Sequence, residues 1–369
     1  MSNKEKPWNN AIHFTPDKYK TFWKDRLSKQ SDILIITGTG WDPRMTALPD
    51  LLKSFGGLGL RHLHCIDYKP SKSFKSPHEK FINKNIEKLY MITEKWSEIT
   101  KIEIITRHKD NRYVGDEEIA KRYKELDLAS YKDILIDISS LSKSLYFTML
   151  LILVTKAKVN HKINIHVVVC QDVELDNQIA ESIDDTRYLK GFRGNTGRQS
   201  QQDIPKIWAP LLSGNKLQRL KDLFDRIKPK DIYPVLPFPS RNPRTDDNLL
   251  IEYRELFVNE WQLNPMNIIY AAEDDPLDVY RRLLALFDQQ KEVLELLGGV
   301  SMVISALSSK ISSIGAFMAA FEEKMAVAHP IGRHEPPESM SFDYWNNDYL
   351  SKFKDNLHSI WLTGEPYGF

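Results

Sequence analysis

The chain has 369 residues, 41% of them hydrophobic and 27% charged, which excludes disorder and coiled coils and predicts two domains. Lys and Arg number 51 against 50 Asp and Glu, so no global excess of positive charge attracts nucleic acid or an anionic membrane. The sequence has no apolar run long enough to span a bilayer, no Cys/His spacing for a metal and a polar N-terminus without a secretory signal, so we expect a cytoplasmic protein.

Strand-like apolar runs alternate with helical stretches in the first half of the chain. A helix is predicted from Pro16, with Thr15 as its N-cap, to about residue 29. Beyond it, strands are predicted at 33–37, 60–66, 102–106, 134–138 and 163–169, and helices at 77–98 and 116–126. This alternation predicts a mostly parallel sheet covered on both faces, which forms a first Rossmann-like domain over residues 1–190.

The alternation lapses at residues 191–205, a stretch rich in glycine and amide side chains that is predicted to be a linker or a mobile loop. A second, smaller Rossmann-like domain follows over residues 206–333. Within it a helix is predicted at 216–228 and strands at 232–236, 267–271, 302–305 and 325–328. The aromatic segment 334–369 needs a surface to cover and is predicted to dock on one of the domains. The fold class is α/β, with two parallel-sheet domains in tandem.

Two polar motifs occur in both halves and in the same order. Each half has an Asp or Asn, a Pro and an Arg after its first predicted strand, and an Ile-Ser-x-Leu-Ser turn followed by Lys after a later one. The motifs are Asp42-Pro43-Arg44 and Asn242-Pro243-Arg244, then residues 138–143 and residues 304–310. The repeated pairs predict an internal duplication in which Pro43 is equivalent to Pro243 and Ser139 to Ser305.

These motifs lie where an open parallel sheet binds ligands. Loops at the carboxyl ends of the strands line one crevice, and helix N-termini there favour anions. Glycines let the backbone approach a ligand, and arginines and lysines bind phosphate or carboxylate. The predicted contacts are Gly38, Gly40, Asp42, Arg44, Ser139, Ser142, Lys143, Arg241, Arg244, Ser305, Ser308 and Lys310. The alternative interpretation is that the serines cap helices and that the cations are solvated.

Three acidic side chains are candidates for general acid–base catalysis, although acids at strand ends also serve as caps. Asp67 ends the second strand and could accept from a ribose hydroxyl, Asp137 precedes the serine turn, and Glu273 closes a later strand. The Gly38-Thr39-Gly40 turn lacks the third glycine of a dinucleotide fingerprint, and the chain has no G-x-x-x-x-G-K-[ST] loop. The catalytic residues, if the protein is an enzyme, therefore stay unknown.

The serine turns resemble the second conserved element of the CARF and SAVED ligand-sensing domains, in which a strand, a Ser/Thr-rich turn, a Lys and an apolar helix follow one another. The matching positions are Ser139, Ser140, Ser142, Lys143, Ser305, Ser308 and Lys310. In those families a Rossmann-like pair binds cyclic oligonucleotides made in antiviral signalling. The resemblance implies a nucleotide or cyclic oligonucleotide as the ligand. The Gly-Gly or Gly-Thr that usually precedes the Lys is absent here, and so is an attached nuclease signature.

The leading hypothesis is a sensor or adaptor that holds a phosphorylated, nucleotide-like small molecule between the carboxyl edges of the two halves. Its anion contacts would be Arg44, Arg244, Lys143 and Lys310. One alternative is a nucleotide- or sugar-processing enzyme that uses the same crevice. Another is a non-catalytic subunit of a bacterial defence or signalling complex, with protein partners docked on the aromatic C-terminal segment. No membrane partner is expected, and there is no strong nucleic-acid signal.

Overall fold

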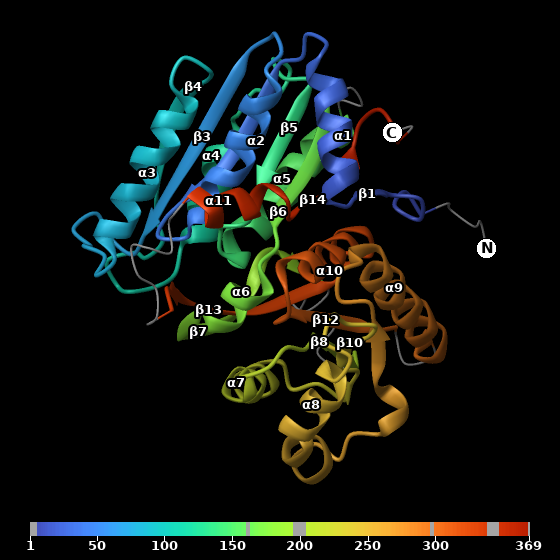
Figure 1. Ribbon diagram of the computed structural model, residues 1–369. Coiled ribbons are helices and arrows are strands. Elements are labelled where there is room, and N and C mark those ends of the chain that lie inside the picture. Colours follow the sequence, from blue (N-terminus) through green and yellow to red (C-terminus); the bar gives the residue numbers. More distant parts are fainter. Residues whose placement is uncertain (1–5, 160–162, 195–203, 296–298, 338–346, 368–369) are drawn as a thin grey trace. The chain divides into compact units, whose positions relative to one another are not determined.

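The computed structural model describes residues 6–159, 163–194, 204–295, 299–337 and 347–367. The chain forms two compact units, one built from Met1–Ala180 with His334–Phe369 and the other from Glu181–Arg333. Each unit contains a largely parallel sheet between layers of helices (Figure 1). The predicted α/β class with two Rossmann-like domains is therefore confirmed.

The first unit has a seven-stranded sheet in the order β1-β14-β6-β5-β2-β3-β4. Strands β2 to β6 are parallel to one another, and β14 is antiparallel to both β1 and β6. The elements are β1 (Ile12–Phe14), α1 (Pro16–Leu27), β2 (Ile33–Thr39), η1 (Pro43–Thr46), α2 (Ala47–Phe55), β3 (Arg61–Lys69), α3 (Glu79–Thr93), β4 (Glu98–Ile105), α4 (Gly115–Lys124), β5 (Asp133–Asp137), α5 (Lys143–Val159), β6 (Asn164–Cys170), α6 (Val173–Gln178), α11 (Asn347–Lys354) and β14 (Leu357–Thr363).

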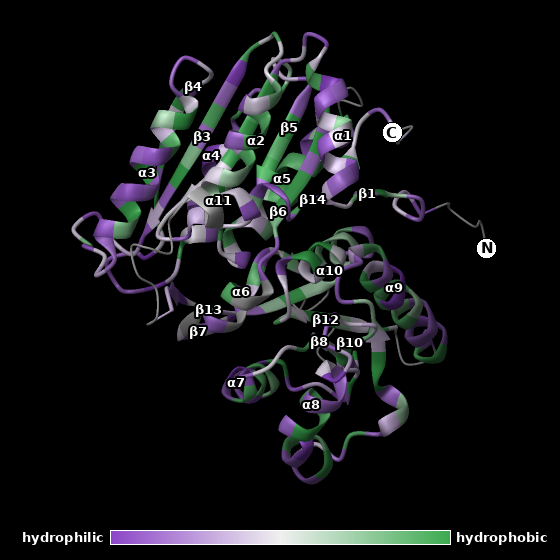
Figure 2. Cartoon of the chain, in the orientation of Figure 1, coloured by the Kyte–Doolittle hydropathy of each residue, from purple (hydrophilic) through white to green (hydrophobic). Residues whose placement is uncertain are grey.

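Helices cover both faces of this sheet. On one face α1, α2, α3 and α11 share a core with the strands, which includes Trp23, Leu48, Leu89, Leu135 and Phe353. On the other face α4 packs beside α5. Helix α5 is buried on most of its sides, and Figure 2 shows apolar residues along α5 and β5 and hydrophilic residues on α3. The central strands are therefore continuous apolar runs, as a sheet covered on both faces requires.

The sheet of the second unit has the order β11-β10-β8-β12-β13-β7, with the short strand β9 beside β8. Helices α7 and α8 contribute to a core with β8 and β12, and α9 packs against α10. The elements are β7 (Ala180–Arg193), β8 (Lys206–Leu211), α7 (Leu217–Ile227), β9 (Asp231–Ile232), β10 (Val235–Pro237), α8 (Thr245–Glu252), η3 (Leu256–Glu260), η4 (Pro265–Asn267), β11 (Ile269–Ala271), α9 (Pro276–Val293), β12 (Ser301–Ala306), α10 (Lys310–Glu322) and β13 (Ala326–Glu335).

The two sheets repeat one strand order. Counted along the chain from β2 and from β8, and with the two-residue strand β9 left out, five parallel strands lie across each sheet in the order third, second, first, fourth and fifth, as in Rossmann folds. Ser139 and Ser305 accordingly lie at the ends of equivalent fourth strands, Ser139 two residues after β5 and Ser305 one residue before the end of β12. The turns that contain Pro43 and Pro243 are not equivalent, because one follows the first strand β2 and the other follows the second strand β10. The predicted equivalence of these two prolines is wrong.

Three segments differ from the expected organisation. Strand β7 places the boundary of the first unit at Ala180 rather than at residue 190, and it includes the first residues of the expected linker. Residues 195–203 of that linker lie outside the described residues. The C-terminal segment does not cover a finished domain, because β14 is itself a buried strand of the first sheet. No helix among the described residues is long and apolar enough to cross a membrane.

Candidate anion-binding turns

The loops after β2 and β5 meet at the carboxyl edge of the first sheet. The hydroxyl of Ser140 donates to the carbonyl oxygen of Gly38 at 2.7 Å. A Cβ added at Gly38 would lie 2.8 Å from Leu141 Cδ2 and 3.1 Å from the Ser140 carbonyl oxygen. Gly38 is therefore required for contact between the two loops. Gly40 differs, because a Cβ there would meet nothing within 4 Å, although its carbonyl oxygen accepts from the side chain of Asn85.

Arg44 is a buried structural residue and not an exposed ligand contact. Its Nη2 lies 2.7 Å from Asp42 Oδ2, and its Nη1 lies 2.8 Å from Asp176 Oδ1. Asp42 also caps η1 by accepting from the backbone N–H of Arg44. Burial acts to lower the pKa of Arg44, but the charges of Asp176 and Asp42 together hold it above its usual value. The burial of Arg44 and Asp42 and the ion pair between them do not support their predicted roles in ligand binding.

Ser139 and Asp137 join the end of β5 to its neighbours. Ser139 Oγ accepts from the backbone N–H of Cys170 at 2.8 Å, and Asp137 Oδ1 accepts from the backbone N–H of Ser139 at 2.9 Å. Thr37 Oγ1 lies 3.4 Å from Asp137 Oδ2. The side chains of Ser139 and Asp137 are completely buried. The interpretations of Ser139 as a ligand contact and of Asp137 as an acid–base catalyst are therefore not supported by their surroundings.

Ser142 and Lys143 lie at the N-terminus of α5 and are both half-buried. The carbonyl oxygen of Ser142 accepts from the backbone N–H groups of Leu145 and Tyr146 in the first turn of the helix. Its hydroxyl begins a chain, with Ser142 Oγ 3.3 Å from Ser144 Oγ and Ser144 Oγ 2.7 Å from the Tyr113 hydroxyl. Three hydroxyls therefore meet near the N-terminus of the helix that Lys143 opens, and the positive end of a helix dipole favours an anion.

Two tyrosines at this edge carry no signal in the sequence. Tyr113 precedes α4, and Tyr68 lies near the end of β3, where its hydroxyl donates to the carbonyl oxygen of Ser140 at 3.0 Å. Burial, and after it the charge of Asp42, raises the pKa of Tyr68 above its usual value. Only the strand order shows that these rings reach the serine turn. Asp67, two residues from the end of β3, is exposed and lies 3.6 Å from Lys69 Nζ.

The turn after β12 repeats part of this arrangement in the second unit. Ser305 is completely buried and accepts from Trp208 Nε1 at 3.0 Å, so its surroundings do not support the predicted ligand contact. Ser309 caps α10 by accepting from the backbone N–H of Ser312. Ser308 and Lys310 are half-buried, and Lys310 is the first residue of the helix. In both units, therefore, a lysine opens the helix that follows the fourth strand.

The remaining candidates lie after β10 and β11. Asn242 Oδ1 accepts from the backbone N–H of Arg244 at 3.1 Å. Arg241 Nε donates to Asp274 Oδ2 at 2.7 Å, and its backbone N–H donates to Glu273 Oε2 at 2.9 Å. Arg244 is exposed, and its guanidinium has no hydrogen-bond partner among the described residues. Because β8 lies between β10 and β12, these arginines belong to a different loop from Lys310.

No group of three His, Cys, Asp or Glu side chains that could hold a metal ion occurs within the part of the chain that the structure describes.

The chain matches no family model and no curated protein. Its similarity to solved structures is weak, at TM-scores of 0.22 in three cases. A universal stress protein from Archaeoglobus fulgidus is 10% identical, and the match covers 83% of this chain and 97% of that one. The tRNA methyltransferase TrmK from B. subtilis is 7% identical over 83% and 94%. TrmN from Thermus thermophilus is 9% identical over 48% and 45%. Likeness at this level carries no argument about function.

Proposed function

We propose that the protein is a sensor or adaptor that binds a nucleotide-like anion at the serine turn of each unit, before α5 in one and before α10 in the other. One observation carries the proposal: Lys143 and Lys310 open the helices that follow equivalent strands of two sheets with the same strand order. In each turn the lysine lies beside a half-buried serine, Ser142 or Ser308. The first and fourth strands of such a sheet flank the switch point where open parallel sheets bind ligands.

Nucleotide chemistry suits this arrangement because phosphate oxygens accept charge-assisted hydrogen bonds from lysine and ordinary ones from hydroxyls and helix N–H groups. The resemblance of the turns to CARF and SAVED domains makes a cyclic oligonucleotide, in a bacterial antiviral setting, the first ligand to try. Binding without conversion is the second part of the proposal. Its support is that Asp137 is buried among its hydrogen-bond partners and that Glu273 bonds to the backbone of Arg241.

A thermal-shift screen of the whole protein tests the proposal. Mononucleotides, dinucleotides and cyclic oligonucleotides are added separately, and each ligand that raises the melting temperature is then incubated with the protein and analysed by chromatography. A ligand present at 100 times its Kd stabilises the native state by about 2.7 kcal/mol, which such a screen detects readily. We expect at least one nucleotide to stabilise the protein and to be recovered unchanged.

Two outcomes contradict the proposal in different ways. If no nucleotide shifts the melting temperature, the turns do not bind this class of ligand. If a nucleotide binds and is converted, the protein is an enzyme and the sensor hypothesis fails, although the site is retained. Inorganic phosphate at the same concentration is the control, because a response to phosphate alone would indicate a general anion effect.

A further inference from the structure

Strand β11 ends the second sheet with an open edge. No strand of the described chain pairs with its outer side. On the inner side the backbone N–H of Ile269 donates to Pro234, and the carbonyl oxygen of Ala271 accepts from Phe238. In a parallel ladder alternate residues bond to opposite neighbours, so the N–H and C=O of Tyr270 point away from β10. Tyr270 therefore presents a backbone donor and acceptor at the edge of the sheet.

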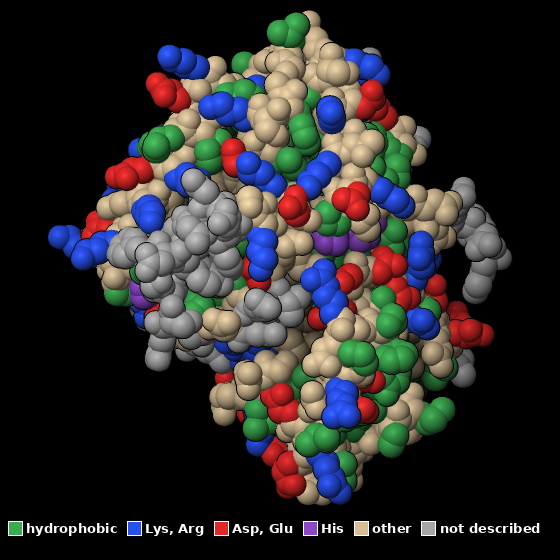
Figure 3. Space-filling model, viewed as in Figure 1, with side chains coloured by type: hydrophobic (Ala, Val, Ile, Leu, Met, Phe, Trp, Pro, Cys, Tyr) green, Lys and Arg blue, Asp and Glu red, His purple; other side chains and the backbone are tan. Residues whose placement is uncertain are grey.

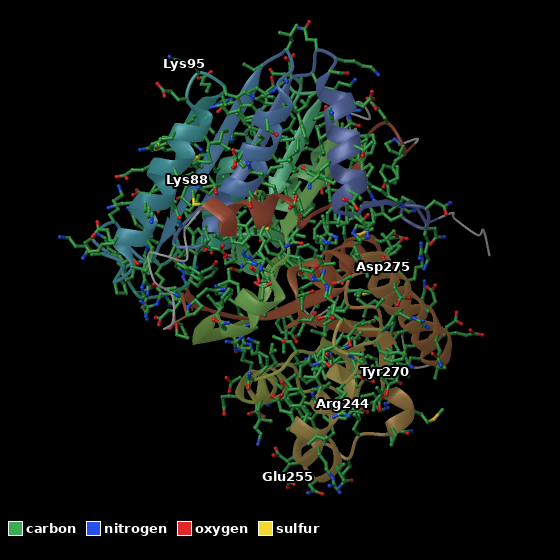
Figure 4. The ribbon with its side chains drawn as sticks, in the orientation of Figure 1. Lys88, Lys95, Arg244, Glu255, Tyr270 and Asp275 are labelled. Carbon is green, nitrogen blue, oxygen red and sulfur yellow. The ribbon has the colours of Figure 1, made fainter. Side chains whose placement is uncertain are left out.

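Exposed apolar side chains are frequent in the stretch of chain that includes this edge. Of the eleven large hydrophobic residues that are most exposed, five fall between residues 238 and 270. Phe238 is 51% exposed and Tyr270 39%, and their rings meet edge to face with centroids 5.9 Å apart. Met266, just before β11, is 88% exposed. Figure 3 shows hydrophobic side chains gathered on the face of this unit where Figure 4 labels Tyr270 and Arg244.

The charge of the same stretch is strongly negative. Residues 238–275 contain eight Asp and Glu and three Arg, a net charge of −5 in a chain whose total is +1. Residues 231–290 contain no lysine at all. The edge strand of the other sheet is different, because β4 carries exposed Lys101 and Glu103. Lysine on an edge strand prevents pairing with other chains, and β11 lacks that protection.

We propose that the β11 edge binds an extended, positively charged segment of a partner protein, which adds a strand beside Tyr270. The backbone of Tyr270 would pair with the segment, Phe238 and Met266 would contact its apolar side chains, and the surrounding carboxylates would favour Lys and Arg. This inference does not depend on the anion site, since it rests on a different strand and on charge of the opposite sign. The protein would then have a surface that binds a protein partner in addition to the proposed site for a nucleotide-like anion.

The test selects peptides from a displayed library of random 12-residue sequences on the whole protein. We expect the selected peptides to be rich in Lys and Arg with interspersed apolar residues, and to bind more weakly as salt is raised. Tyr270→Pro removes the outward N–H without removing a bond to β10, and proline is tolerated on an edge strand. Fluorescence anisotropy should show at least tenfold weaker binding to Tyr270→Pro. Met91→Ala, at an exposed apolar position on α3, should bind like the parent.

Several results would overturn the proposal. These are failure of the library to yield a binder, selection of acidic peptides, and equal affinity of the selected peptides for the parent and Tyr270→Pro. If Tyr270→Pro does not fold, Phe238→Ser provides the same comparison, because it removes a side-chain contact and leaves the strand intact. Sedimentation of the protein without peptide measures its oligomeric state. A dimer that Tyr270→Pro abolishes would show that the edge binds a second copy of this chain instead.

Discussion

Arg44 and Arg244 follow an Asx-Pro pair in the same way, yet their surroundings are opposite. In both turns the Asx side chain accepts from the arginine's own backbone N–H. The guanidinium of Arg44 is then enclosed between Asp42 and Asp176, whereas that of Arg244 is exposed. Asp176 lies on α6, far along the chain from Arg44, so no local pattern predicts this pair. A buried charge of this kind is a structural residue, and its removal leaves two carboxylates without their partner.

Arg44→Met should therefore destabilise the protein strongly. Breaking a buried ion pair from one side costs about 3 to 5 kcal/mol, because the remaining charge stays buried. Arg244→Met is the matched control and should change the free energy of unfolding by no more than about 0.5 kcal/mol, since its side chain is exposed. Urea unfolding followed by circular dichroism measures both. Similar stability of the two variants would show that the enclosure of Arg44 contributes little.

Two buried histidines predict how stability depends on pH. Burial, and after it the charges of His62 and Arg122, lowers the pKa of His64 to about 4. Burial and the charge of Arg26 also lower the pKa of His166 well below its usual value. An unfolded histidine has a pKa of about 6.5, so below that pH the unfolded state binds more protons than the folded one.

The protein should therefore lose stability as the pH falls from about 6.5 toward 4, by up to about 1.4 kcal/mol per pH unit for each histidine. Urea midpoints measured at pH 7 and pH 5 test this. His64→Met should reduce the difference between the two midpoints. The variant His108→Met, at an exposed position, should leave the difference as it is in the parent. An unchanged difference in His64→Met would mean that His64 does not titrate in this range.

At the scale of single elements, strand β14 determines whether the first sheet is complete. It lies between β1 and β6, and all of its residues are buried. The segment after β14 is also held to the sheet, because Arg26 donates hydrogen bonds both to Asp133 at the start of β5 and to Glu365. The hydrogen bond from Arg26 is the largest effect on the pKa of Glu365 and lowers it to about 2, although burial acts in the opposite direction.

Ser359→Pro should prevent the first unit from folding. Ser359 pairs with Phe14 on one side and Val168 on the other, so proline there removes a donor from a strand with two neighbours. The edge variant Tyr270→Pro is the control and should fold. Limited proteolysis should digest the first unit of Ser359→Pro while the second unit resists. Resistance of both units would mean that β14 can be lost without loss of the sheet.

The elements that the sequence does not predict share physical causes. Strand β8 contains Pro210, and proline is rare in a central strand. The sequence pattern therefore does not predict β8, and the first strand that it predicts in the second half corresponds to β10. Strand β7 is polar along most of its length, and β14 reads as an aromatic tail because its partners, β1 and β6, are far away in the sequence. The parallel strands β2, β5 and β6, by contrast, are short, continuous apolar runs bounded by polar turns, which identifies them directly.

On the scale of the whole molecule, the second unit is an insertion in the first. Residues 181–333 interrupt a unit whose two parts, Met1–Ala180 and His334–Phe369, make one sheet. The strand order could not be inferred from the sequence, because the two Pro-Arg turns suggested the wrong equivalence. The serine turns indicate the correct equivalence, because in both units such a turn connects the fourth strand to the helix that follows it.

Fragments of the chain should behave according to this insertion. Residues 181–333 contain a complete unit and should unfold cooperatively alone, whereas residues 1–180 lack β14 and should not. Joining residues 1–180 to 334–369 through a short Gly/Ser linker should restore folding of the first unit. Thermal unfolding by calorimetry checks all three chains. A cooperative transition for residues 1–180 alone would show that β14 is not required.

The central claim is that the lysine of each serine turn binds a nucleotide-like anion, and calorimetric titration tests it most directly. The ligand is the cyclic oligonucleotide that stabilises the parent most, and the variants are Lys143→Met and Lys310→Met. The matched controls are Lys121→Met on α4 and Lys291→Met on α9, where both lysines are exposed. A charge-assisted hydrogen bond contributes about 1.5 to 3 kcal/mol, so each turn variant should bind about ten- to a hundredfold more weakly, with an unliganded melting temperature near that of the parent. The controls should bind as the parent does. Equal affinity of all five proteins would contradict the claim and remove both lysines from the site.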